Sequence, residues 1–221
     1  MSNILYSSGM ASDSNPFAIS RTERRAVLSR HFIPVVEELA EAGTAYVDLS
    51  VERIIKAGGV SRSAFYNYFD DKVDLLVAMA EGVIRDLIDT GAAWWELPPE
   101  GTKSDLRTAL RAPLDNYQAR HMILGAIVEV ATYDERVRAQ QRSLTEPVMA
   151  ALAIHIQQAQ ANGTADPELD AERTAKWVVW MVERGLYQLV TPADPEEAEL
   201  LLDAITDVIW RVFYAGYRDP A

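Results

Sequence analysis

The stretch from Leu49 to Leu76 reads LSVERIIKAGGVSRSAFYNYFDDKVDLL. Apolar residues recur at helical spacing on both sides of the pair Gly58-Gly59, which predicts two short helices joined by a tight turn. The two helices share a small predicted core, made of Ile54, Ile55, Val60, Ala64, Phe65 and Phe69. This pattern is typical of a helix-turn-helix, whose second helix enters the major groove of DNA.

The second helix of this motif carries the side chains that contact DNA in such an arrangement. We expect helices over Val51–Ala57 and Arg62–Tyr68, because Ser50 and Ser61 are suitable N-caps. Arg62 can donate two hydrogen bonds to a guanine edge. The neighbouring candidates are short or polar and suit phosphate or base contacts: Ser61, Ser63, Tyr66 and Asn67. The aromatic residues Phe65, Tyr68 and Phe69 are predicted to be core residues, not base-stacking ones.

The segment resembles the TetR family of bacterial repressors over about residues 22–80. The family's pattern is matched at Ser50, Ile54, Gly59, Val60, Ser61, Tyr66, Phe69, Lys72 and Leu75. The resemblance implies that Tyr66 and Lys72 contact phosphates, and that Arg62, Ser63 and Asn67 contact bases or phosphates. Ser50 and Ser61 complete the set of DNA-binding candidates. Two positions depart from the pattern, since Ile55 replaces a small alanine and Gly58 replaces the alanine before the turn glycine.

The composition fits a folded, acidic protein with a local basic region. The chain has 221 residues, 49% of them hydrophobic, no cysteine and a net charge of -12. A charge of this sign taken alone argues against nucleic acid. Residues 1–75 nevertheless have a net charge of only -2, and residues 53–69 contain three basic residues and no acidic one. The charge distribution therefore allows DNA binding at this segment.

Helical periodicity continues along the rest of the chain and predicts an all-α fold. We expect a disordered tail over residues 1–20, a three-helix DNA-binding domain over 21–72, and a larger helical ligand-binding and dimerisation domain over 73–221. The predicted helices are 21–42, 51–57, 62–68, 72–90, 103–119, 121–132, 134–161, 170–190 and 195–214. Residues 94–101 are predicted to form a loop. Pro34 predicts a kink or a late start in its helix, and Pro113 and Pro147 predict breaks.

The last two predicted helices have the pattern of a dimer interface. The stretch from Ala175 to Val182 is apolar almost all round, so it must be covered on two sides. The final helix carries a wide apolar stripe from Ala198 to Val212. Two such helices per subunit can form a symmetric four-helix interface. The family resemblance also implies a homodimer that joins through these helices.

The stretch WVVWMVERGLYQL, together with Trp210, resembles a mycobacterial branch of the family, the repressors of the ethionamide-activating monooxygenase. In that branch the ligand cavity is long, narrow and apolar. The resemblance implies that Glu183, Trp210 and Tyr117 line such a cavity. Val179 and Val182 stand where that branch has asparagines, so the cavity would be more apolar here. We expect a small hydrophobic or aromatic effector. At helical spacing, however, Trp177, Trp180, Tyr187 and Trp210 also suit a core or an interface.

These patterns predict a ligand-responsive dimeric repressor of the bacterial cytoplasm, which binds a pseudo-palindromic operator. An alternative is a helical DNA-binding regulator whose sensor half responds to a protein partner. A fully packed sensor core would favour the protein partner, whereas a cavity in it would favour a small-molecule ligand. A helical-bundle enzyme has little support, because the three histidines are isolated and no phosphate-binding glycine loop occurs. We expect no cofactor or metal, and no apolar run approaches the ~18–20 residues of a membrane span.

Overall fold

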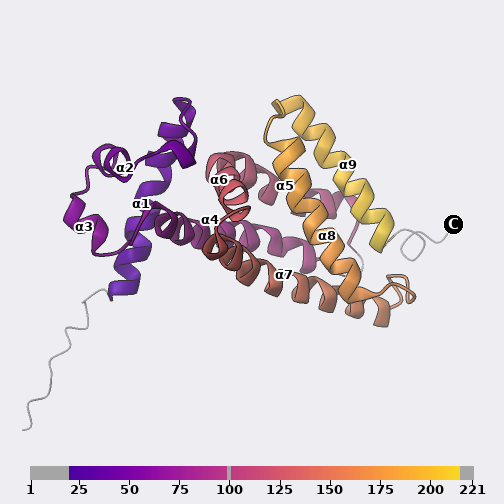
Figure 1. The fold of residues 1–221 in the computed structure, drawn as a ribbon. Coiled ribbons are helices and arrows are strands. Elements are labelled where there is room, and N and C mark those ends of the chain that lie inside the picture. The colour runs from indigo at the N-terminus through magenta and orange to yellow at the C-terminus, as the bar shows by residue number, and fades with distance from the viewer. Residues whose placement is uncertain (1–19, 99–100, 215–221) are drawn as a thin grey trace, which may run out of the picture.

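The computed structural model describes residues 20–98 and 101–214, and all regular structure within them is helical (Figure 1). The bounds are α1 (Arg21–Glu41), a 3-10 turn η1 (Tyr46–Asp48), α2 (Val51–Ala57), α3 (Arg62–Tyr66), α4 (Lys72–Trp95), α5 (Lys103–Ala119), α6 (His121–Ala131), α7 (Glu135–Ala161), α8 (Ala171–Gly185), a π-helical turn η2 (Leu186–Val190) and α9 (Pro195–Phe213). The all-α prediction is confirmed. The tail predicted at 1–20 lies outside the described residues except for Ser20, as do residues 215–221 of the second predicted domain.

Figure 1 places α1, α2 and α3 together at one end of the molecule and α8 and α9 side by side at the other. The helix α4 connects the two parts, since it packs against α1 on one side and against α5, α6 and α7 on the other. One apolar core runs from Phe32 and Phe65 through Leu75 and Met79 to Ile127. A second core, which includes Trp94, joins α5, α7, α8 and α9. The predicted boundary after residue 72 thus falls at the start of a helix that serves both cores.

Local capping explains why several helices begin where the sequence predicts. Ser20 and Glu23 form a capping box at the start of α1, so this helix begins at Arg21 although Pro34 lies inside it. Asp71 caps α4, and its side chain accepts a hydrogen bond from the backbone N–H of Asp74. These side chains satisfy backbone donors that a helix start leaves without partners.

The predicted end of α4 and the two predicted helix breaks are wrong, and tertiary packing explains each. The helix α4 extends to Trp95 instead of ending at Thr90, because the Trp94 side chain is buried in the second core and keeps this turn helical. The helices α5 and α7 run through Pro113 and Pro147 without a break. A proline removes one backbone hydrogen bond, and the buried neighbours of these helices outweigh that loss.

An ion pair joins the first helix to the fourth. Arg25 makes two side-chain contacts to the Asp74 carboxylate, at 2.9 and 2.8 Å, and also donates to the carbonyl oxygen of Tyr68. Both side chains are half-buried, at 30% and 24% exposure. The hydrogen bonds from Arg25 lower the pKa of Asp74, because they stabilise its ionised form. This pair therefore fixes the packing of α1 against the start of α4.

No described helix is both long enough and apolar enough to cross a membrane.

We expect Asp74→Asn to lower the free energy of unfolding at pH 7 by roughly 1.5–3 kcal/mol, the usual range for hydrogen bonds to charged groups. The folded-state pKa of Asp74 lies below its unfolded value of about 3.9, so this stabilisation is complete above that pH. It should disappear as the pH falls through the lowered pKa. Urea unfolding at pH 7 and at stepwise lower pH measures the difference between wild type and variant.

Arg85→Ala is the matched control, since Arg85 pairs with Glu81 on the surface of the same helix at 61% and 55% exposure. This change should cost less than about 0.5 kcal/mol. Equal losses in the two variants would contradict the role given to the Arg25–Asp74 pair.

Candidate DNA interface and sensor cavity

The turn between α2 and α3 depends on two glycines that meet different constraints. Gly59 has a φ of 65°, a backbone conformation that costs little only for glycine. Gly58 has an ordinary φ, but a Cβ atom built there would lie 2.6 Å from Cε1 of Phe32. The departure from the family pattern at Gly58 therefore makes room for the buried Phe32 ring. Phe32 in turn contacts Phe65 and Phe69 edge-on, at centroid distances of 6.0 and 6.5 Å.

The helix α3 buries one face and exposes the other. Phe65 and Phe69 are buried and Tyr68 is half-buried, as predicted for core residues. Ser61 caps the helix by accepting a hydrogen bond from the backbone N–H of Ala64. The exposed face carries every candidate predicted on this helix: Ser61, Arg62, Ser63, Tyr66 and Asn67. A set of polar side chains thus lies on a helix held by an aromatic core.

Basic side chains around α3 are held in place by neighbouring groups. Arg62 pairs with Glu52 of α2 at 2.7 Å, and its guanidinium lies over the Tyr66 ring, 5.3 Å from the ring centroid. Arg21 donates to the carbonyl oxygen of Asn67 at 2.8 Å, just after the last turn of α3. Carbonyls at a helix end attract cations. The helix α3 ends at Tyr66, two residues before the predicted end.

The remaining two DNA-binding candidates have structural contacts. Ser50 is exposed and caps α2, accepting a hydrogen bond from the backbone N–H of Arg53. Lys72 is half-buried, and its ammonium donates to three carbonyl oxygens, those of Tyr46, Val47 and Leu49. An ammonium has three donors, so these contacts use all of them. Tyr46 also donates to the carbonyl oxygen of Lys72, and the loop before α2 is therefore fastened to the start of α4.

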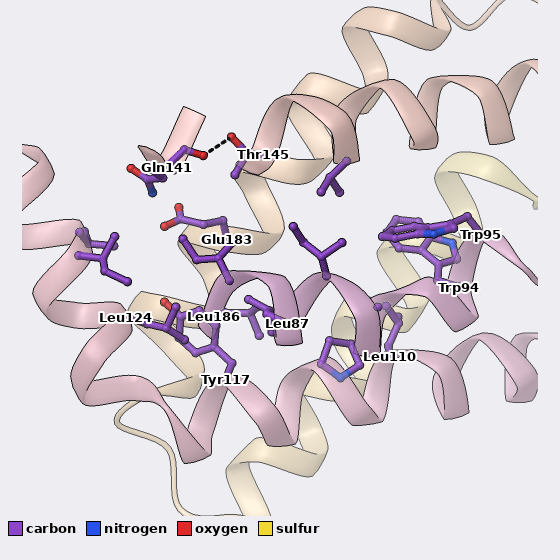
Figure 2. A pocket seen from close by; sticks show the side chains of 17 residues that line it. Leu87, Trp94, Trp95, Leu110, Tyr117, Leu124, Gln141, Thr145, Glu183 and Leu186 are labelled. Atoms are coloured by element: carbon purple, nitrogen blue, oxygen red, sulfur yellow. Dashed lines mark hydrogen bonds between the residues drawn. The ribbon is translucent and has the colours of Figure 1, made fainter. Parts of the chain in front are cut away.

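A cavity of about 150 Å³ lies between α4, α5, α6, α7 and the end of α8 (Figure 2). Tyr117 and Glu183 line it, as the sequence predicts. Val182 lies instead in a neighbouring hollow against α9. Val179 and Trp210 pack half-buried against the second core and do not line the cavity. The structure thus brings two of the five predicted ligand contacts together.

Several lining residues were not identified from the sequence. The cavity is also lined by Trp94 and Trp95 from α4, Leu110 from α5, and Gln141 and Thr145 from α7. Trp94 and Trp95 fall in the stretch predicted to be a loop. The two adjacent tryptophans could have indicated a buried segment at this position, because tryptophan side chains are mostly buried in folded proteins.

Burial changes the acid–base properties of the polar cavity residues. Desolvation raises the pKa of Glu183, and the charge of Arg184 opposes this only in part. Burial and the nearby Glu183 both raise the pKa of Tyr117. Glu183 Oε2 and the Tyr117 hydroxyl are buried and have no hydrogen-bond partner in the described part of the chain. An unpaired buried polar group costs free energy, so this wall is suited to a polar partner.

The outer surface of α8 and α9 is apolar. Of the eleven large hydrophobic side chains that lie exposed among the described residues, seven belong to residues 177–212. They are Trp177, Trp180, Met181, Leu189, Leu200, Val208 and Val212, and Trp177 is 78% exposed. Contiguous exposed apolar side chains of this kind mark interaction surfaces.

Comparisons with known proteins agree with this geometry. Residues 36–79 match the model of the bacterial regulatory proteins of the tetR family. No curated protein matches the chain. Similar solved structures include the TetR family transcriptional regulator PfmR from Thermus thermophilus, with 20% identity, a TM-score of 0.65, and coverage of 83% of this chain and 98% of that one.

Two further regulators have a similar fold. The regulatory protein TetR from Rhodobacter sphaeroides is 20% identical, with a TM-score of 0.62 and coverage of 88% and 100%. The fatty acid degradation regulator FadR from Bacillus halodurans is 16% identical, with a TM-score of 0.65 and coverage of 92% and 100%. Residues 36–79 thus match the N-terminal domain of the tetR family, and the fold of the described chain is similar to that of solved TetR-family regulators.

Proposed function

We propose that the chain is a dimeric transcriptional repressor that binds a pseudo-palindromic operator and is released from it by a small hydrophobic effector. The exposed polar face of α3, on a helix-turn-helix that matches the tetR family, carries the proposal. Residues 21–72 are the DNA-binding domain in this proposal, and 73–221 form the ligand-binding and dimerisation domain. A DNA-binding role places the protein in the bacterial cytoplasm.

In this function Arg62 reads a base, and its neighbours position α3 on the phosphate backbone. The Arg62 guanidinium pairs with Glu52, and at 65% and 62% exposure this ion pair is weak enough to exchange for contacts to a guanine edge. Ser61, Ser63, Tyr66 and Asn67 are exposed on α3 or at its ends and suit phosphate and base contacts.

The cavity favours a small-molecule effector over the alternative in which the sensor half answers a protein partner. Its lining is apolar apart from a few polar side chains, as ligand pockets usually are. Two helices connect this cavity to the DNA-binding domain. The helix α4 contributes Ile84 and Leu87 to the lining, and α7 contributes Gln141. Near its start α7 also contacts the cap of α4, through an ion pair of 3.0 Å between Arg136 and Asp71.

The first test is operator binding. The wild type should bind a pseudo-palindromic duplex selected from random DNA, with two recognition helices about 34–36 Å apart, and the affinity should fall steeply with salt. Arg62→Ala should cost about 1–3 kcal/mol and relax specificity at one position of each half-site. The measurement is selection and sequencing of bound duplexes for both proteins, followed by titration. An unchanged sequence preference in Arg62→Ala would exclude base reading by this residue.

A second test separates direct from indirect action of Lys72. Because its three donors already hold the loop before α2, we expect Lys72→Met to lower the free energy of unfolding by about 1–3 kcal/mol and to weaken DNA binding. The salt dependence should keep its slope, because no phosphate contact is lost. A slope reduced by about one charge, with unchanged stability, would assign Lys72 to a phosphate instead. The exposed Lys56, changed to Met, is the control for stability and should alter it by less than about 0.5 kcal/mol.

The dimer is the third test. We propose that the apolar surface of α8 and α9 forms an interface of more than about 1,000 Å² in total. Val208 lies in this surface and is 41% exposed, so Val208→Glu should leave the subunit folded but produce monomers that lose operator binding. Light scattering measures the oligomeric state, and circular dichroism measures whether the subunit is folded. Tyr133→Glu, at a site 61% exposed outside α8 and α9, should remain dimeric. A dimeric Val208→Glu protein would exclude this surface as the interface.

A further inference from the structure

All the buried side-chain nitrogen and oxygen atoms that lack a hydrogen-bond partner among the described residues belong to residues that line the cavity. Three such nitrogen or oxygen atoms have no hydrogen-bond partner: Trp94 Nε1, the Tyr117 hydroxyl oxygen and Glu183 Oε2. Each belongs to a residue that lines the cavity. Buried polar atoms in native proteins are nearly always paired, and each exception calls for an explanation. Two of the three, on Tyr117 and Glu183, are oxygen atoms of residues that Figure 2 shows toward the same side of the cavity, and this pair indicates where a polar group of a ligand would bind.

The cavity has a polar end and an aromatic end. Figure 2 shows Glu183, Tyr117 and Gln141 toward one side, and Trp94 with Trp95 at the other. Burial and the charge of Glu183 both raise the pKa of Tyr117. Apolar side chains occupy the wall between the ends, among them Leu87, Leu110 and Leu186. A ligand with one polar group and an apolar body fits this distribution.

The charges of the wall specify the sign of the polar group. Among the described residues that line the cavity, Glu183 is the one with an acidic side chain, and none is Lys, Arg or His. Arg184, whose charge acts on Glu183, is exposed, is not part of the lining, and lies over the ring of Tyr187. A bound carboxylate or phosphate would therefore lie near a desolvated acid without a compensating cation. A bound ammonium would instead supply the hydrogen bonds that Glu183 Oε2 lacks.

We infer that the cavity binds a small aryl-alkyl amine, whose ammonium donates to Glu183 Oε2 beside Tyr117 and whose ring packs among the leucines toward Trp94 and Trp95. The volume of about 150 Å³ limits the size, since an apolar cavity of this volume holds a molecule such as benzene. This inference rests on the proposed function, because it specifies the chemical class of the effector. It also predicts that free carboxylates, such as the fatty acids, are excluded.

The test compares probes of one shape and different charge on the full-length protein without DNA. The probes are 2-phenylethylamine, 2-phenylethanol and phenylacetate, titrated by isothermal calorimetry near neutral pH. We expect the amine to bind most tightly, by about thirtyfold or more over the alcohol, which is the effect of pairing a buried charge. Phenylacetate should not bind measurably. An amine that binds no better than the alcohol, a carboxylate that binds as well as the amine, or a panel without any binding would each overturn the inference.

Variants of the cavity acid assign the effect to one side chain. Glu183→Gln keeps the shape and removes the charge, so the amine should lose its advantage while the alcohol retains its affinity. This variant should be at least as stable as the wild type, because a desolvated carboxyl is lost. Glu172→Gln, an exposed acid on the first turn of α8, is the matched control and should bind all probes as the wild type does. Undiminished amine preference in Glu183→Gln would also overturn the inference.

Operator titration with the same compounds keeps this inference distinct from the proposed function. Amine binding that depends on Glu183 but leaves operator affinity unchanged would support the ligand class and contradict effector control. Release of DNA by neutral aromatic compounds, without a preference for the amine, would support effector control and contradict the ligand class.

Discussion

The helix α4 has to complete two cores at once, and the rest of the molecule depends on this constraint. Its first turns bury Leu75, Leu76 and Met79 against the helices of the DNA-binding domain. Its last turns carry Trp94 into the second core and line the cavity. A single helix therefore contacts both the cavity and the packing of α1 beside the helix-turn-helix. The bidentate ion pair between Arg25 and Asp74 holds α1 against the first turn of α4.

The local sequence was sufficient to predict the DNA-binding domain, because its structure depends on short-range signals. Ser50 and Ser61 cap their helices, and Gly59 provides the left-handed turn, so the bounds of α2 agree with the prediction to the residue. The substitution at Gly58 needed the structure for its explanation, since Phe32 lies 26 positions earlier in the chain. Lys72 likewise looked like a phosphate ligand, and only the fold shows that its ammonium is surrounded by loop carbonyls.

The sensor half was less predictable, because its site depends on how long helices pack. The hydrophobic periodicity predicts the helices of this half. The breaks predicted at Pro113 and Pro147 are absent, because the packing of neighbouring helices is not visible in a local sequence pattern. Tyr117 and Glu183 were identified through a resemblance, whereas Trp94 and Gln141 reach the cavity only through the packing of α4 and α7. The desolvated carboxyl of Glu183 has no local signature either. Its buried Oε2 atom has no hydrogen-bond partner among the described residues, and such a group costs folding free energy.

In the proposed function, a signal would pass from the cavity to DNA through the contacts between helices, and the strength of these contacts limits the coupling. Allosteric coupling between two sites is typically about 1–3 kcal/mol. The Arg136–Asp71 pair between α7 and the cap of α4 is about half exposed on both sides, and such pairs contribute about 0–1 kcal/mol. This ion pair alone is therefore too weak to carry the coupling. The buried contacts between α4 and α7 are more extensive and involve apolar side chains that cannot be displaced without loss of packing. In the proposed function, a ligand between these helices would therefore act mainly through the packed core and only to a small extent through the ion pair.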